Sequence, residues 1–125
     1  MRDIESRNDI EKLLKAFYNK AFADDLIGVY FIGKTNFDLK KHLPSLIDFW
    51  DSILFNSENY KNNIIDIHNH LNSIYRFRPE YFLRWEMIFL ETVDDLFTGY
   101  IAEIAKQKAT SFTSALTFYF IDNNK

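Results

Sequence analysis

Glycine and proline are unusually rare in this sequence, and their scarcity limits the folds open to the chain. It contains 3 Gly and 2 Pro in 125 residues. Sheet proteins of this size use these residues in the turns between short strands. Apolar residues, in contrast, recur at spacings of three and four over long stretches, as they do along one face of a helix. The sequence therefore predicts an all-α fold.

The length, charge and cysteine content of the chain limit the classes of protein to which it can belong. With 125 residues and 47% hydrophobic content, residues 1–125 are predicted to form a single domain with its own core. The net charge of −3 argues against a nucleic-acid-binding surface. The absence of cysteine excludes disulfides, thiolate metal sites and cysteine nucleophiles. The sequence has neither a membrane-spanning apolar run nor the apolar core of a signal peptide, so we expect a cytoplasmic protein.

Four long helices are predicted from the apolar pattern, at residues 10–21, 38–55, 79–99 and 100–121. Capping side chains at positions 6–9 precede the first helix, and Pro79 suits the first turn of the third. Pro44 predicts an irregularity in the second helix near His42. The polar residues 56–63 are predicted to form a loop, and residues 64–74 are either helical or irregular.

Two of the three histidines, His68 and His70, lie close together after this loop. On a regular helix, residues two apart are separated by about 200° around the axis. The two side chains therefore cannot both bind one metal ion from such a helix. The sequence also lacks a His-Glu-x-x-His motif, a Gly-rich phosphate loop and a nucleophile elbow, so a hydrolytic enzyme has little support.

Aromatic residues make up 18% of the chain, with 13 Phe, 7 Tyr and 2 Trp. One interpretation is a core built largely of rings. Another is a pocket whose rings surround a flat, apolar cofactor. Composition alone does not choose between the two.

Three sets of residues carry a resemblance to a known family. They are Phe17-Tyr18 with Phe31; His42-Leu43-Pro44 with Asp48-Phe49-Trp50 and Tyr60; and His70-Leu71 with Phe82, Arg84-Trp85 and Glu91-Thr92-Val93. In their order, and nearly in their spacing, these sets are similar to those of the group III truncated haemoglobins. The resemblance covers nearly the whole chain. It implies a two-over-two helical sandwich around a single b-type haem.

The resemblance also implies a role for individual residues. His70 would be the proximal ligand of the iron, and Tyr18, His42 and Trp85 would be the polar residues on the distal side. Lys41 and Arg84 are candidates for contacts with the haem propionates, with solvated helix faces as the alternative. The apolar pocket wall would include Phe31, Leu46, Phe49, Trp50, Tyr81 and Phe82.

The choice between His70 and His68 as the iron ligand depends on the resemblance alone. The apolar face of residues 64–74 lies between the two histidines, so helical periodicity does not decide it. The His70-Leu71 pair matches the family's His-Leu pair, which selects His70. The interval from His70 to Trp85 is longer than in similar sequences, and the interval from His68 is longer still.

The resemblance implies a protein that binds O₂, NO or CO at a five-coordinate haem iron. NO dioxygenase or peroxidase-like activity is a further implication, and either would need an external reductase as partner. The alternative is a helical protein-protein interaction module without a cofactor, in which the aromatic residues form the core or a partner groove.

Overall fold

The computed structural model describes residues 1–34, 37–57 and 64–122. Every regular element in these ranges is helical, which confirms the all-α prediction. Two of the elements, η1 and η2, are single turns of π-helix. In chain order the elements are α1 (Arg7–Ala23), η1 (Tyr30–Lys34), α2 (Leu39–Phe55), α3 (Ile64–Ile74), α4 (Pro79–Leu96), α5 (Tyr100–Thr117) and η2 (Phe118–Asp122).

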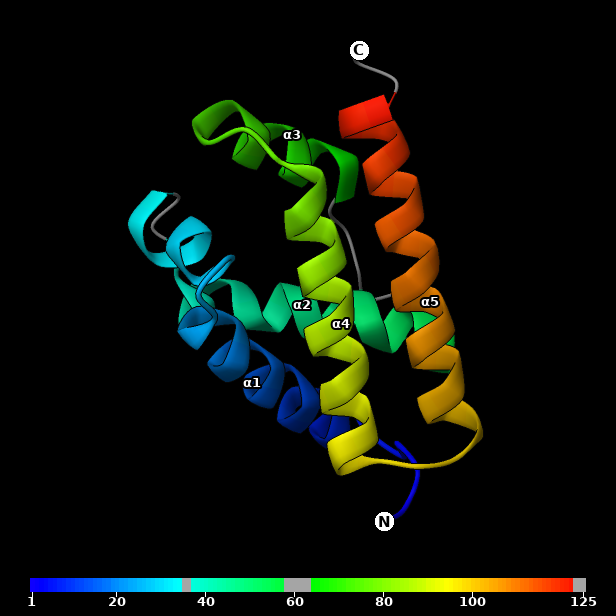
Figure 1. The fold of residues 1–125 in the computed structure, drawn as a ribbon. Coiled ribbons are helices and arrows are strands. Elements are labelled where there is room, and N and C mark those ends of the chain that lie inside the picture. The colour runs from blue at the N-terminus through cyan, green and yellow to red at the C-terminus, as the bar shows by residue number, and fades with distance from the viewer. Residues whose placement is uncertain (35–36, 58–63, 123–125) are drawn as a thin grey trace.

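The helices are arranged in two layers (Figure 1). Helices α4 and α5 run side by side and antiparallel in one layer, and α1 and α2 pack together in the other. Contacts between α1 and α4 join the layers. Helix α3 lies across one end of the molecule, near the C-terminal end of α5.

Most helix boundaries follow the local sequence signals. The Ser6 side chain accepts a hydrogen bond from the backbone N–H of Asp9 and caps α1. Helix α4 begins at Pro79, where a missing amide hydrogen costs nothing. Helix α2 continues through Pro44, whose nitrogen cannot donate a helical hydrogen bond. Residues 64–74 are helical, while Tyr60 and most of the predicted loop lie outside the described residues.

The centre of the fold is a cluster of rings that joins three helices. The ring of Phe89 is fully buried and stacks on Trp50 and Trp85, with centroids 4.9 and 5.2 Å away. Phe17 packs edge-on against Phe89 from α1 at 5.5 Å. Such pairs add to the free energy gained from burying the rings. Much of the aromatic content therefore belongs to the core.

An ion pair between exposed Arg2 and buried Asp9 near the N-terminus contributes a pH-dependent part of the stability. The Arg2 guanidinium donates to both carboxylate oxygens of Asp9 at 2.6 Å. Asp9 is only 4% exposed. The hydrogen bond from Arg2 is the main cause that lowers the pKa of Asp9 from 3.8 to about 2.

We expect acid to remove the contribution of Asp9 between about pH 4 and pH 2. Because its pKa is lower in the folded state, the unfolded state binds more protons in this range, and the stability falls as the pH falls. The loss should be on the order of 1–2 kcal/mol, since Arg2 is exposed and its charge is screened. Urea unfolding from pH 6 to pH 2 measures it, with Asp9→Asn as the comparison. Equal pH slopes in the two proteins would contradict the assignment.

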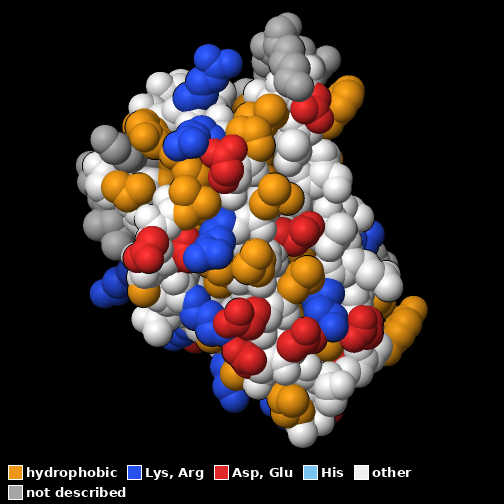
Figure 2. Space-filling model, in the orientation of Figure 1, with side chains coloured by type: hydrophobic (Ala, Val, Ile, Leu, Met, Phe, Trp, Pro, Cys, Tyr) orange, Lys and Arg blue, Asp and Glu red, His pale blue; other side chains and the backbone are white. Residues whose placement is uncertain are grey.

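The outer face of α4 and α5 carries acidic and basic side chains side by side (Figure 2). Lys106 is within 2.7 Å of Asp94 and 2.9 Å of Glu103. Exposed pairs of this kind each contribute little to stability. None of the described helices is both long and apolar enough to cross a membrane.

Candidate cofactor-binding cavity

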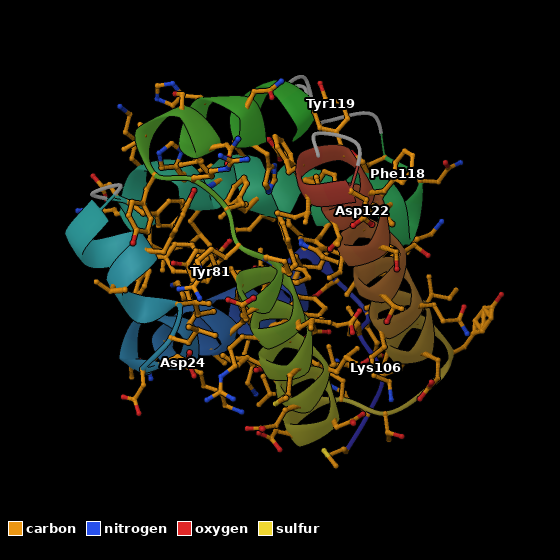
Figure 3. All side chains as sticks on the ribbon, turned by 45° about the horizontal axis from the view of Figure 1, so that its top comes forward. Asp24, Tyr81, Lys106, Phe118, Tyr119 and Asp122 are labelled. Atoms are coloured by element: carbon orange, nitrogen blue, oxygen red, sulfur yellow. The ribbon has the colours of Figure 1, made fainter. Side chains whose placement is uncertain are left out.

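A cavity of about 180 Å³ lies between the two layers and α3. Its wall is almost entirely aromatic and aliphatic, and all five α-helices contribute to it. Figure 3 shows one wall residue, Tyr81, at the start of α4. The lining residues are Tyr18, Ile27, Tyr30, Phe31, Phe37, Leu46, Phe49, Trp50, Ile67, His68, Leu71, Phe77, Tyr81, Phe82, Trp85, Phe112, Thr113 and Leu116.

Tyr18 places a hydroxyl group at the cavity from α1. Its ring is held by Phe17 on one side, at 4.8 Å, and by a stacked contact with Phe37 at 5.5 Å. No hydrogen bond joins the hydroxyl to any of the described residues. Burial raises the pKa of Tyr18 above its ordinary value, so the group stays protonated and can donate.

Trp85 contributes a second donor from α4. Its indole is fixed by stacking on Phe89 and by an edge contact with Phe17 at 5.5 Å. Within the described ranges, its N–H also has no hydrogen-bond acceptor. Because Trp85 and Tyr18 both pack against Phe17, the two donors occupy the same side of the cavity.

His68 supplies an imidazole from α3. The side chain is half-buried and lines the cavity. Its ring neighbours are Phe77 at 6.0 Å and Phe120 at 6.4 Å, and neither of these packs on Phe17 in the described contacts. The cavity therefore has an imidazole on its α3 wall and two unpartnered donors on the wall formed by α1 and α4.

His70 occupies a different position from the one implied by the resemblance. Its side chain is exposed and is absent from the cavity lining. The physical reason is the phase of α3: a rotation of about 200° from His68 carries His70 to the solvent side. Of these two histidines, the structure places His68 at the cavity.

The remaining polar predictions also fall outside the cavity. His42 is exposed and stacks on Phe37 at 5.1 Å, so that Phe37 lies between it and Tyr18. Lys41 is exposed as well. Arg84 Nε donates to the Asp24 carboxylate at 2.8 Å, which is a contact between α4 and the end of α1. None of these three side chains lines the cavity.

The apolar residues that the resemblance assigned to a haem pocket do lie at the cavity, and their contact with a haem stays a prediction. All six predicted wall residues line the cavity, together with Tyr18 and Trp85. Phe112 and Leu116 line the cavity from α5, and the resemblance assigned them no role. Tyr30 lies in the π-helical turn η1, and Phe77 lies between α3 and α4. Apolar periodicity gives no signal at either place.

Comparison with known proteins relates this architecture to one solved structure in particular. No protein-family model matches the chain, and no curated protein matches it. The crystal structure of a group III truncated hemoglobin from Campylobacter jejuni superposes with a TM-score of 0.83. The match covers 96% of this chain and 95% of that one, at 21% sequence identity. The chain therefore has the two-over-two truncated globin fold.

Proposed function

We propose that the protein binds a b-type haem in this cavity, that His68 would hold its iron, and that a diatomic gas would bind on the side of Tyr18 and Trp85. The observation that carries the proposal is the division of polar groups around an otherwise apolar cavity. One imidazole stands on the α3 wall, and two unpartnered donors stand on the wall beside Phe17. The likeness to a truncated hemoglobin supports it.

The residues present suit a haem. Aromatic and aliphatic side chains bury the faces of a porphyrin, and a neutral imidazole is the usual globin ligand of its iron. A haem iron with one imidazole supplies an open coordination position for O₂, NO or CO. Among the described residues there is no group of three or more His, Cys, Asp or Glu side chains that could hold a metal ion together.

Tyr18 and Trp85 would act as hydrogen-bond donors to a ligand that acquires negative charge. The Tyr18 hydroxyl remains protonated because burial raises its pKa, and the indole N–H of Trp85 is always a donor. Hydrogen bonds count for more in an apolar cavity than in water. Their rings are already held by Phe17, Phe37 and Phe89, so little conformational entropy is lost when a ligand binds.

The proposal also includes a partner that supplies electrons and a role for His42. Turnover of NO or peroxide would need electrons from a separate donor, so a reductase is the expected partner. His42 would act from the edge of the site, where its stacking on Phe37 provides one resting position.

The test is the visible absorption spectrum of the protein as purified and after addition of hemin. We expect an intense Soret band, which shifts when dithionite and CO are added. The band should titrate with a stoichiometry of about one hemin per chain. If hemin gives no such band with correctly folded protein, the haem proposal is overturned. The alternative function, a protein-protein interaction module without a cofactor, is then preferred.

A further inference from the structure

Helix α3, which carries His68, is attached to the fold differently from the other helices. The closely packed pairs are α1 with α2, α1 with α4, and α4 with α5. Among the described residues, helix α3 is not part of any of these pairs. Individual side-chain contacts at its C-terminal end are well defined.

The first of these contacts is a hydrogen bond from η1. The Tyr30 hydroxyl donates to the backbone carbonyl of Tyr75 at 2.9 Å, across 45 positions of sequence. The amide of Tyr75 in turn donates to the carbonyl of Leu71 at 3.0 Å, so it extends the last turn of α3. Tyr30 is only 4% exposed, which shields the hydrogen bond from water. The bond fixes the end of α3 relative to η1.

The second contact is an aromatic cluster centred on Phe77, just beyond α3. The ring of Tyr30 stacks on Phe77 at 5.3 Å, and Phe120 packs edge-on against it at 5.2 Å. The His68 ring lies 6.0 Å from the same side chain. The Asn72 side chain accepts a hydrogen bond of 2.7 Å from the Phe77 amide, which ties the cluster back to α3.

Both outer rings of this cluster come from π-helical turns. Tyr30 begins η1, and Phe120 lies within η2. Figure 3 shows other residues of η2, Phe118 and Tyr119, at the end of α5 close to α3. The π-helix is rare, and its single turns are frequently found at functional sites. Here the two turns bring the rings of Tyr30 and Phe120 into contact with Phe77, which lies next to His68.

We propose that Tyr30 is a positioning residue for His68. Its hydroxyl holds the end of α3 through Tyr75, and its ring holds Phe77, so together they set how far the imidazole reaches into the cavity. This role rests on the proposed haem function. Groups that orient a metal ligand typically change the affinity for the metal by about 10- to 100-fold when they are removed.

Tyr30→Phe tests the role because it removes the hydroxyl and keeps the ring on Phe77. In the hemin-loaded, dithionite-reduced protein, we expect the iron–imidazole stretching band in the resonance Raman spectrum to shift. Hemin transfer to excess apomyoglobin should become about tenfold faster. Tyr100→Phe is the matched control, since Tyr100 is 72% exposed at the far end of α5, and it should leave both measurements unchanged.

A second experiment, in His68→Gly protein, distinguishes an effect of Tyr30 on the position of the ligand from a direct effect of Tyr30 on the haem. In His68→Gly protein supplied with free imidazole, the ligand is no longer attached to α3. Tyr30→Phe should then leave the iron–imidazole frequency unchanged. A shift as large as in the wild-type background would overturn the proposal, because Tyr30 would then act through the cavity wall instead of through α3.

Hydrogen exchange of the α3 amides gives a readout that needs no haem. Tyr30→Phe should speed exchange in α3 of the hemin-free protein and leave α1 unaffected. If wild-type protein binds hemin but Tyr30→Phe changes neither the frequency nor the exchange, the positioning role is wrong and the haem function stands. If folded wild-type protein binds no hemin, the haem function itself fails. Phe120→Leu, which loosens the same cluster from η2, should shift the frequency in the wild-type background as well.

Discussion

Replacing His68 by glycine is expected to abolish the bond between the protein and the haem iron. The His68 imidazole lines the cavity from α3, and no other histidine does so in the described part of the chain. The Soret band of the reduced protein should lose the features of imidazole ligation, and hemin should be retained far less tightly. Addition of free imidazole should restore the reduced and CO-bound spectra, since glycine leaves a space of the right shape beside Phe77 and Phe120.

His70→Gly is the matched control for this experiment. It introduces the same residue two positions later in the same helix, so the cost in helix stability, about 1 kcal/mol, is similar. The side chain it removes is exposed. The spectra of His70→Gly should therefore match those of the wild type. Loss of imidazole ligation in His70→Gly, with normal spectra in His68→Gly, would show that His70 binds the iron, as the resemblance implies.

Tyr18→Phe is expected to raise the O₂ dissociation rate of the haem-loaded protein by about 10- to 100-fold. A hydrogen bond to a charged acceptor contributes about 1.5–3 kcal/mol, and each 1.4 kcal/mol corresponds to a factor of ten. The phenyl ring would keep its contacts with Phe17 and Phe37, so the change isolates the hydroxyl. Stopped-flow displacement of O₂ by CO measures the rate.

The CO dissociation rate provides the internal comparison for Tyr18. Bound CO carries less negative charge than bound O₂, so its dissociation should change much less. Trp85→Phe, which removes the other donor, should act in the same direction on O₂. Similar changes in the O₂ and CO rates of Tyr18→Phe would instead indicate an altered cavity shape and would contradict the role as a donor.

Most of the wall residues that the resemblance implied also lie in strong local apolar patterns. Phe49 and Trp50 stand in the apolar stripe of α2, and Phe82 and Trp85 in that of α4. Once such stripes face a common core, their largest side chains meet at its centre. The same argument covers Tyr18, which borders the apolar face of α1.

The orientation of the histidines could not be predicted in this way. His68 and His70 flank the apolar face of α3, so the rotation of the helix about its axis decides which of them faces inward. The described contacts at this end of α3 come from Tyr30, Phe77 and Phe120, which are distant from one another in sequence or lie outside regular helix. His42 is a similar case, because its outward position depends on a stacking contact with Phe37 from another segment.

The sequence by itself determined the all-α fold and most helix boundaries. These follow from the spacing of apolar residues, from capping side chains and from the scarcity of glycine and proline, all of which act within a few residues. The aromatic residues of the cavity wall were implied by the family resemblance. The tertiary structure alone decided that His68 lines the cavity, and that His70, His42, Lys41 and Arg84 lie outside it. The physical reason is that a helix has a fixed periodicity but no fixed rotation about its axis until contacts from remote segments set one.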